Sequence, residues 1–436
     1  MKYYQKLTLL FALMWGFIGI QRVIISIIMP AITTDLKLSN TDVGMIVGVT
    51  GFVWAFGTVI CAGLGDHFGR RPVIIGCTIL ASVFSWITGL VHSLGQMLLV
   101  RGVLGLFEGG PFGPAIATLS EEAPENRRAM NVGIVTGCFM LIGVCVGSQV
   151  AVWLLDKFGS WRPVFYVISI PGIIVGITLA FVLRESPTVA EKIRLRKAGK
   201  ATAGHGGAHK VKLVDVLKYK NVLVSTINSI PTMAWLWIYT GFASLFLTNV
   251  HHFDMGSVGL IIAASGIGGF IGEFAMGAIS DVIGRKKALI FSAFLCSCFG
   301  ISVALLPIGT SVLVFSSLFF MWGLFGAGMY PMYLGTLPAE AVPPEIAGTA
   351  IAIPTAVGEM LGAALMPAIA GRLADAYSLY APIWMAACAG FFICIISIFY
   401  VETAPRCLRR MTCKPTREDH LLRPFRQSKQ LAPAQE

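Results

Sequence analysis

The chain has 436 residues, of which 56% are hydrophobic and only 13% charged, and its mean hydropathy is +0.77. Soluble domains are about 45–50% apolar and about 25% charged, so the composition excludes an ordinary soluble protein and predicts a membrane protein. In a soluble chain the net charge of +11 would suit a nucleic acid, but in a membrane protein the placement of the cations indicates orientation instead.

Twelve apolar stretches follow one another along the chain, each close to the about 20 residues that a helix needs to cross a bilayer. Short connections that carry charge, proline or glycine separate them. The pattern predicts an all-α membrane protein with twelve transmembrane helices in two six-helix bundles. The predicted spans are Leu7–Pro30, Val43–Leu64, Val73–Val91, Leu94–Leu119, Ala129–Leu155, Pro163–Leu183, Val222–Asn249, Ser257–Ile279, Ala288–Leu306, Val312–Leu337, Ile346–Leu373 and Pro382–Val401.

Four regions follow from this pattern. They are an N-terminal bundle over residues 1–183, a linker over 184–220, a C-terminal bundle over 221–401 and a basic tail over 402–436. The linker is rich in basic residues, with a patch of glycine, alanine and histidine that is typical of a flexible loop. Its His205 and His209 have no acidic or thiol partner nearby, and most of the ten cysteines lie inside spans. We therefore expect no metal site and no disulfide framework.

The positive charges are distributed unevenly between the two sides of the predicted bundle. Most of the 33 lysines and arginines lie at the N-terminus, in the even-numbered connections, in the linker or in the tail. Because positive charge is retained on the cytoplasmic side, we expect both termini and the linker in the cytoplasm of a bacterial inner membrane. The residues on the other side are Lys37, Lys157, Arg162 and Arg372.

A short charged turn occurs once in each half, as GDHFGRR at residues 65–71 and SDVIGRK at residues 280–286. Each copy lies between the second and third spans of its half. A turn with Asp, two residues, Gly and two basic residues at this place resembles the signature of the major facilitator superfamily. Its recurrence indicates two copies of one membrane unit. The resemblance covers nearly the whole chain and implies alternating access around a cavity between the halves.

The charged side chains of these turns are candidates for gating. In the family the turn is implicated in closing the cytoplasmic side, and charges at helix ends can latch two helices in one state. The alternative is that the positive charge only keeps the loop inside. The candidate gating residues are Asp66, Arg70, Arg71, Asp281, Arg285 and Lys286.

Five charged residues lie in the interior of predicted spans, where charge is costly and marks functional candidates. At 1.5 Å per residue, Arg22 lies about 12 Å and Arg101 about 10 Å from the outer side. Two unpaired cations at similar depth call for an anion, which predicts an anionic substrate. The full set is Arg22, Arg101, Glu108, Glu273 and Glu359.

The three glutamates of this set are assigned different roles. Glu108 follows Arg101 by seven residues and shares its helix face, so its protonation can respond to that arginine or to a bound anion. The alternative is a structural pair that never titrates. Glu359, near mid-membrane on a glycine-rich helix, is a second proton site or a partner for a polar substrate. For Glu273 we expect a gate contact.

The segment RGVLGLFEGG at residues 101–110 looks like the fourth span of the anion:cation symporter branch of the superfamily, which includes sialin-like and sugar-acid carriers. The resemblance implies that Arg22 and Arg101 bind the substrate and that Glu108 is protonated during transport. The acid that the branch has just before the first-span arginine is here Gln21, which cannot titrate. Either proton coupling depends on Glu108 alone, or the coupling stoichiometry or the coupling ion differs from that of the branch. Sodium therefore stays an alternative to the proton.

Aromatic residues of the second half, together with Gln21, complete the predicted substrate contacts. Trp235 and Tyr239 lie in the seventh span and Tyr330 in the tenth. Such side chains can stack on a ring and hydrogen-bond its hydroxyls. The alternative is that they belong to the aromatic belt of the membrane interface.

These observations predict a secondary active transporter rather than an enzyme, with no catalytic residue. It would carry a small organic anion, a sugar acid or another carboxylate, in symport with protons. We expect no cofactor beyond the coupling ion, no partner beyond the substrate and the lipid bilayer, no bound nucleic acid, and a monomer. The alternatives are an exporter of drugs or lipids, including spinster-like carriers that also have an arginine and a glutamate in the fourth span, and a transporter-like solute sensor.

Overall fold

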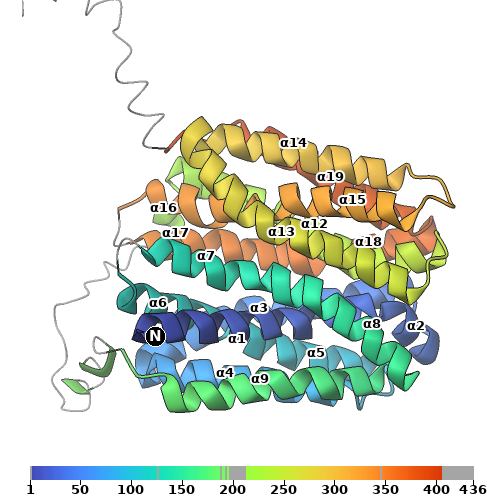
Figure 1. Cartoon of the computed structure of the whole chain (residues 1–436). Coiled ribbons are helices and arrows are strands. Elements are labelled where there is room, and N and C mark those ends of the chain that lie inside the picture. The colour runs from blue at the N-terminus through green and yellow to red at the C-terminus, as the bar shows by residue number, and fades with distance from the viewer. Residues whose placement is uncertain are drawn as a thin grey trace, which may run out of the picture.

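Long helices running side by side make up the computed structural model, and all regular secondary structure in its described residues is helical (Figure 1). The structure describes residues 2–124, 127–186, 189–191, 194–195, 213–343 and 346–404. Most of the predicted linker, with His205 and His209, and most of the predicted tail lie outside these residues.

The first half contains the helices drawn from blue to green in Figure 1. Ser39 begins the second long helix, because its hydroxyl accepts a hydrogen bond from the Asp42 amide as an N-cap does. The elements are α1 Tyr3–Ile27, α2 Met29–Leu36, α3 Asn40–Phe68, α4 Arg70–Thr88, α5 Leu94–Gly109, α6 Phe112–Glu122, α7 Arg128–Cys138, the π-helical segment η2 Phe139–Val146, α8 Gly147–Phe158 and α9 Arg162–Val182.

The second half contains the helices drawn from light green to red. Asp254 is the equivalent cap, and its side chain accepts from the Ser257 amide. The elements are α11 Leu213–Val216, α12 Lys220–Asn249, α13 Met255–Ile283, α14 Arg285–Ala304, α15 Val312–Ala327, the π-helical segment η3 Pro331–Thr336, α16 Leu337–Glu340, α17 Ala347–Val357, the π-helical segment η5 Gly358–Leu365, α18 Met366–Ala376 and α19 Tyr380–Ser397.

Eleven helical stretches of the described residues are long and apolar enough to cross a membrane. Of the twelve predicted spans, only the fourth is not among these stretches. It is divided into α5 and α6 at Gly110 and Pro111. Proline has no amide hydrogen and clashes with the preceding turn, which explains a break at this point. The predicted all-helical membrane architecture is confirmed, and the fourth span is interrupted.

The bundle has two distinct ends. We call the end with the turns before α4 and α14 the basic end, and the end where α3 begins and α18 finishes the opposite end. At the basic end the turn glycines Gly69 and Gly284 have φ of 107° and 106°, a conformation that side chains rarely adopt. The repeated turn therefore has the same backbone shape in both halves.

Helix α3 of the first half touches η5 and α18 of the second half through their backbones, toward the opposite end. A Cβ atom built at Gly44 would lie 2.2 Å from the Pro367 carbonyl oxygen, and one at Gly48 would lie 2.4 Å from the Ala364 carbonyl oxygen. Contacts this short accept only glycine. These two positions fix how closely the halves approach.

The Asp375 carboxylate ties α3 and α18 together at their ends. It accepts from the backbone amides of Asn40 and Thr41 at 3.0 and 2.8 Å, and from their side chains at 2.9 and 2.6 Å. An acid of the second half thus caps the N-terminus of α3, where a negative charge is favoured. In α12, the Ser244 hydroxyl donates to the Ile27 carbonyl of α1. The halves are therefore also joined by hydrogen bonds toward the opposite end.

The Gly48 contact makes a testable prediction about this closure. Gly48→Leu should push α3 away from α18 and lengthen the distance between spin labels at Thr34 and Tyr377, both exposed at the opposite end, by about 2 Å, the range over which helix spacing varies with side-chain size. Double electron–electron resonance on a cysteine-free background measures this distance. Gly63→Leu, on the same helix but facing open space, is the matched control. An equal shift in both variants would contradict the contact's role.

Candidate functional site

An ion pair between the two halves lies at the centre of the candidate site. The Arg22 Nη2 atom of α1 lies 2.8 Å from the Glu359 Oε2 atom of η5, and both side chains are buried, at 5% and 4% exposure. The expectation that Arg22 lacks a partner is therefore wrong. Sequence reasoning missed the pair because its members are 337 positions apart.

Glu359 sits at the start of a π-helical segment. Such segments are rare and occur often at functional sites, because the extra residue per turn re-aims a side chain. The π-helical segment that carries Glu359 belongs to the helix that also makes the close contacts with α3. The position of the carboxylate and the packing of the halves therefore depend on one helix.

Two tryptophans flank the Arg22 guanidinium. Its central carbon lies 3.9 Å from the Trp237 ring centroid and 5.1 Å from the Trp54 ring centroid. Cations within about 6 Å of an indole ring are attracted by its negative face. Trp54 belongs to α3 of the first half and Trp237 to α12 of the second, so both halves hold the cation. Trp54 was not among the predicted site residues.

Several buried hydrogen-bond donors of this region have no acceptor in the described part of the chain. They are Arg22 Nε, Trp54 Nε1, Trp237 Nε1 and the Tyr333 hydroxyl. The Tyr330 hydroxyl donates only to a weak acceptor, the Met233 sulfur at 3.6 Å. Each buried donor without an acceptor costs about 1–3 kcal/mol. A group that supplies acceptor oxygens would satisfy these donors.

Arg101 lies beside the backbone of Arg22, and its guanidinium donates to backbone carbonyls. Its Nη1 and Nη2 atoms donate to the carbonyls of Gln21 and Arg22 at 3.0 and 3.2 Å. A helical carbonyl can accept a second hydrogen bond through its other lone pair. Gln21, predicted to contact substrate, donates from its amide nitrogen to the Ser82 hydroxyl at 2.9 Å. Arg101 thus holds α1 at the residue that carries the central ion pair.

Glu108 is fully buried, and neither of its carboxylate oxygens has a hydrogen-bond partner within the described residues. Arg101 on the same helix makes no salt bridge with it there. The carboxyl lies two residues before the break in the fourth span. The alternative, a structural ion pair between Arg101 and Glu108, is therefore not formed in the described residues.

The predicted aromatic contacts Trp235 and Tyr239 lie in a different cluster. Their rings stack with centroids 5.7 Å apart, and Tyr239 packs on Trp322 and donates to Ser265. With Met140 of the first half they line a small cavity. They have no hydrogen bond to the central ion pair. Glu273, expected at a gate contact, is half-buried and has no partner in the described residues.

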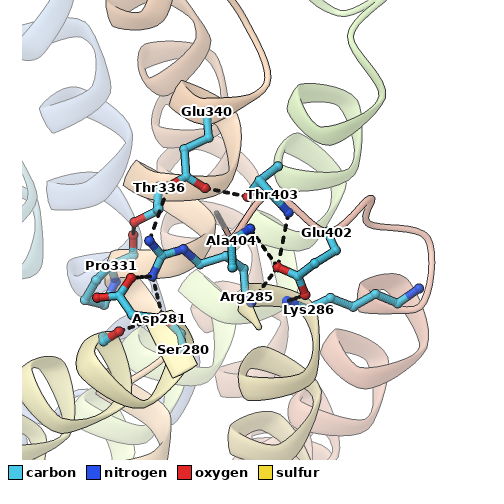
Figure 2. A network of polar contacts seen from close by, with 11 residues as sticks. Ser280, Asp281, Arg285, Lys286, Pro331, Thr336, Glu340, Glu402, Thr403 and Ala404 are labelled. Carbon is cyan, nitrogen blue, oxygen red and sulfur yellow. Dashed lines mark hydrogen bonds and ion pairs between the residues drawn. The ribbon is translucent and has the colours of Figure 1, made fainter. Parts of the chain in front are cut away.

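At the basic end, Arg285 is the centre of the polar network shown in Figure 2. Its guanidinium lies 2.6 Å from Asp281 and 3.2 Å from Glu340. Glu402 accepts from the backbone amides of Arg285 and Lys286 at 2.8 and 3.3 Å. The Lys286 ammonium donates to a carbonyl at the end of α19. The network joins four helix ends of the second half, those of α13, α14, α16 and α19.

The first half repeats this network. Arg70 lies 2.7 Å from Glu121, and Glu185 accepts from the backbone amides of Arg70 and Arg71 at 3.0 Å each. The Arg71 guanidinium donates to the Ala180 carbonyl. The Asp66 side chain lies outside the described part of the chain. Glu121, Glu185, Glu340 and Glu402 were missed, although the internal repeat could have indicated them, because the pairs occupy matching places in the two halves.

Comparisons with known proteins agree with this architecture. A family model described as Major Facilitator Superfamily matches residues 11–358. The chain is 25% identical to a probable 4-methylmuconolactone transporter of Cupriavidus pinatubonensis, over 80% of this chain and 79% of that protein. It is 26% identical to the hexuronate transporter of Bacillus subtilis, over 72% and 76%, and 24% identical to the gentisate transporter of Corynebacterium glutamicum, over 82% and 79%.

Among solved structures, the fold resembles a bacterial homologue of the human lysosomal transporter Spinster in an inward-facing conformation, with a TM-score of 0.70 and 18% identity over 92% of this chain and 96% of that one. The xylose transporter XylE of E. coli in an inward open conformation gives a TM-score of 0.69 and 18% identity over 92% and 98%. These likenesses concern the fold.

The central ion pair makes a prediction about stability. Arg22→Met leaves Glu359 buried without its cation and should destabilise the protein by about 3–5 kcal/mol, whereas the double variant Arg22→Met/Glu359→Met should recover most of that loss. Thermal or denaturant unfolding of the purified protein measures both, and a double-mutant cycle gives the coupling energy. Additive effects of the two substitutions would show that the pair is not coupled.

Proposed function

The chain belongs to the major facilitator superfamily, an integral membrane transporter family, and we propose that it is a symporter that carries a small organic anion together with protons by alternating access. One observation carries the proposal. The only described ion pair between the halves, Arg22 with Glu359, lies buried among hydrogen-bond donors that have no acceptor. The named organic-acid transporters among its relatives support an acid as the substrate.

The balance of buried charge favours coupling to protons. The middle of the spans holds two arginines and three glutamates, so with every group ionised the acids already exceed the cations. A further carboxylate would add to an uncompensated negative charge, which is costly at this depth. An anion therefore enters most favourably when protons neutralise the resident carboxylates. The groups are Arg22, Arg101, Glu108, Glu273 and Glu359.

In the proposed cycle, the substrate carboxylate replaces Glu359 on Arg22. A proton binds the Glu359 carboxylate and removes its attraction to the guanidinium, and Arg22 then binds the anion. Because proton and anion each favour the same state of the pair, each raises the affinity for the other. After the halves rearrange, the anion and the proton leave and the ion pair forms again.

Arg101 and Glu108 have supporting roles in this cycle. An ionised carboxylate without a partner in a buried site costs several kcal/mol, and binding a proton removes the charge. Glu108 is therefore proposed as the second proton site. Arg101, which donates to the carbonyls of Gln21 and Arg22, transmits changes in α5 to the backbone that carries Arg22. Gln21 positions this helix through Ser82.

The orientation of the transporter is part of the proposal. The basic end, with the Arg70 and Arg285 networks, faces the cytoplasm because positive charge is retained there. The opposite end then faces the outside and is the side at which the halves touch most closely. The two networks lie within their own halves and keep each half rigid while the halves move relative to one another.

The coupling is testable in proteoliposomes. Radiolabelled uptake from a panel of acids should rise severalfold when the outer solution is made acidic relative to the lumen, and a protonophore should abolish accumulation above equilibrium. Replacing the proton gradient by a sodium gradient should give no accumulation. Sodium-driven uptake without a pH gradient would contradict the proton as coupling ion.

The residue assignments are testable in the same system. Glu359→Gln cannot release a proton, so it should retain exchange of labelled for unlabelled substrate but lose pH-driven accumulation by at least tenfold. Arg22→Gln should lose both. Glu108→Gln and Arg101→Ala should slow proton-driven uptake by at least tenfold. Trp153→Phe, at an exposed position far from the site, is the control. Unchanged transport in Glu108→Gln or Arg101→Ala would overturn those two assignments.

A further inference from the structure

Four aromatic side chains gather around the central ion pair, and we call them the aromatic cage: Trp54, Trp237, Tyr330 and Tyr333. The two indoles lie within 5.1 Å of the Arg22 guanidinium carbon. The two phenol rings contact each other with centroids 5.5 Å apart, and the Tyr330 hydroxyl contacts Met233, which packs against Gly358 beside Glu359. The wall around the carboxylate-binding arginine is therefore largely aromatic.

The hydrogen-bond donors of the cage are available to a ligand. Both indole N–H groups and the Tyr333 hydroxyl are buried without an acceptor among the described residues. Tyr330 donates only to a sulfur. A carboxylate has several lone-pair directions and can accept from Arg22 and both indoles at once. The two indole donors thus belong to the rings that flank the Arg22 guanidinium, where an anionic head group would bind.

The other polar side chains near the centre are partly engaged. Gln21 donates to Ser82, and Arg101 donates to the carbonyls of Gln21 and Arg22. The Gln21 Oε1 atom and the Glu108 oxygens are buried acceptors without a partner among the described residues. A ligand with many hydroxyls needs a matching set of free donors and acceptors, since each unmatched buried hydroxyl weakens binding. The centre offers an aromatic surface instead, and flat rings bind such surfaces by offset stacking and edge contacts.

We propose that the aromatic cage selects a carboxylate attached to a flat, unsaturated ring over a polyhydroxylated or saturated one. The carboxylate lies on Arg22 and the indole N–H groups, and the ring packs against the cage. This inference rests on the proposed function, because it specifies the anion that this site takes. Trp54 comes from the first half and the other three residues from the second, so the ring is held by both halves at once.

Three acids of similar size test the selection: benzoate with a flat ring, cyclohexanecarboxylate with a puckered ring, and glucuronate with hydroxyls. Isothermal titration calorimetry of the purified full-length protein at one pH gives their affinities. Benzoate should bind at least tenfold tighter than either of the others. Tighter binding of glucuronate or cyclohexanecarboxylate than of benzoate overturns the inference.

Substitutions separate the contribution of the aromatic ring to binding from that of the indole N–H group. Trp54→Phe keeps a ring and loses the donor, so it should weaken benzoate and cyclohexanecarboxylate about equally, by about tenfold, and leave their ratio unchanged. Trp237→Leu loses the ring and should bring the ratio of the two affinities close to one. Trp153→Phe should change neither value. A ratio unaffected by Trp237→Leu contradicts the cage, and Trp54→Phe provides an independent test if the leucine variant does not fold.

The outcomes distinguish this inference from the proposed function. Binding of glucuronate alone, lost in Arg22→Gln, would keep the anion carrier and overturn the aromatic selection. If Arg22→Gln leaves the binding of every acid unchanged, the anion site itself is wrong and the inference falls with it.

Discussion

The buried ion pair between Arg22 and Glu359 is the constraint on which the rest of this structure depends. Neither charge is stable alone at this depth, since removing one partner from a buried pair leaves the other uncompensated. The partners belong to different halves. Any ligand that replaces one of them therefore changes the interaction between the halves, and the energetics of binding and of rearrangement cannot be separated at this point.

The duplication of the chain extends to its polar networks but not to its centre. At the basic end, Arg70 with Glu121 and Glu185 corresponds to Arg285 with Glu340 and Glu402. Both networks fasten the ends of helices within one half, and neither reaches across to the other half in the described residues. In the centre the arginines come from the first half, and Glu359 with three cage residues from the second. The symmetric networks join helices within each half, and the asymmetric centre is where we propose that the substrate binds.

The sequence predicts the helices and the repeat because both depend on local signals. Hydropathy over about 20 residues identifies a span, and the turn motif marks its place. Side-chain partners depend on helix rotation, which hydropathy does not fix when a helix is apolar all round. Trp235 and Trp237 are two residues apart, or about 200° around the helix axis, and only Trp237 lies against Arg22. Trp54 and Glu359 were separated from Arg22 by too much sequence for any motif to join them, and the break at Gly110 and Pro111 was hidden by the apolar residues on both sides.

The location of the closest contacts connects the proposed role of the central pair to the rest of the bundle. Toward the opposite end the halves meet through glycine backbones and the Asp375 cap, and these contacts have a fixed geometry. The helix that bears Glu359 continues directly into α18, which makes those contacts. In the proposed cycle, a change in the charge of Glu359 acts on the same helix that makes the contacts at the opposite end. Since packed backbones cannot stretch gradually, we propose that this helix has discrete positions and that binding at the centre selects between them.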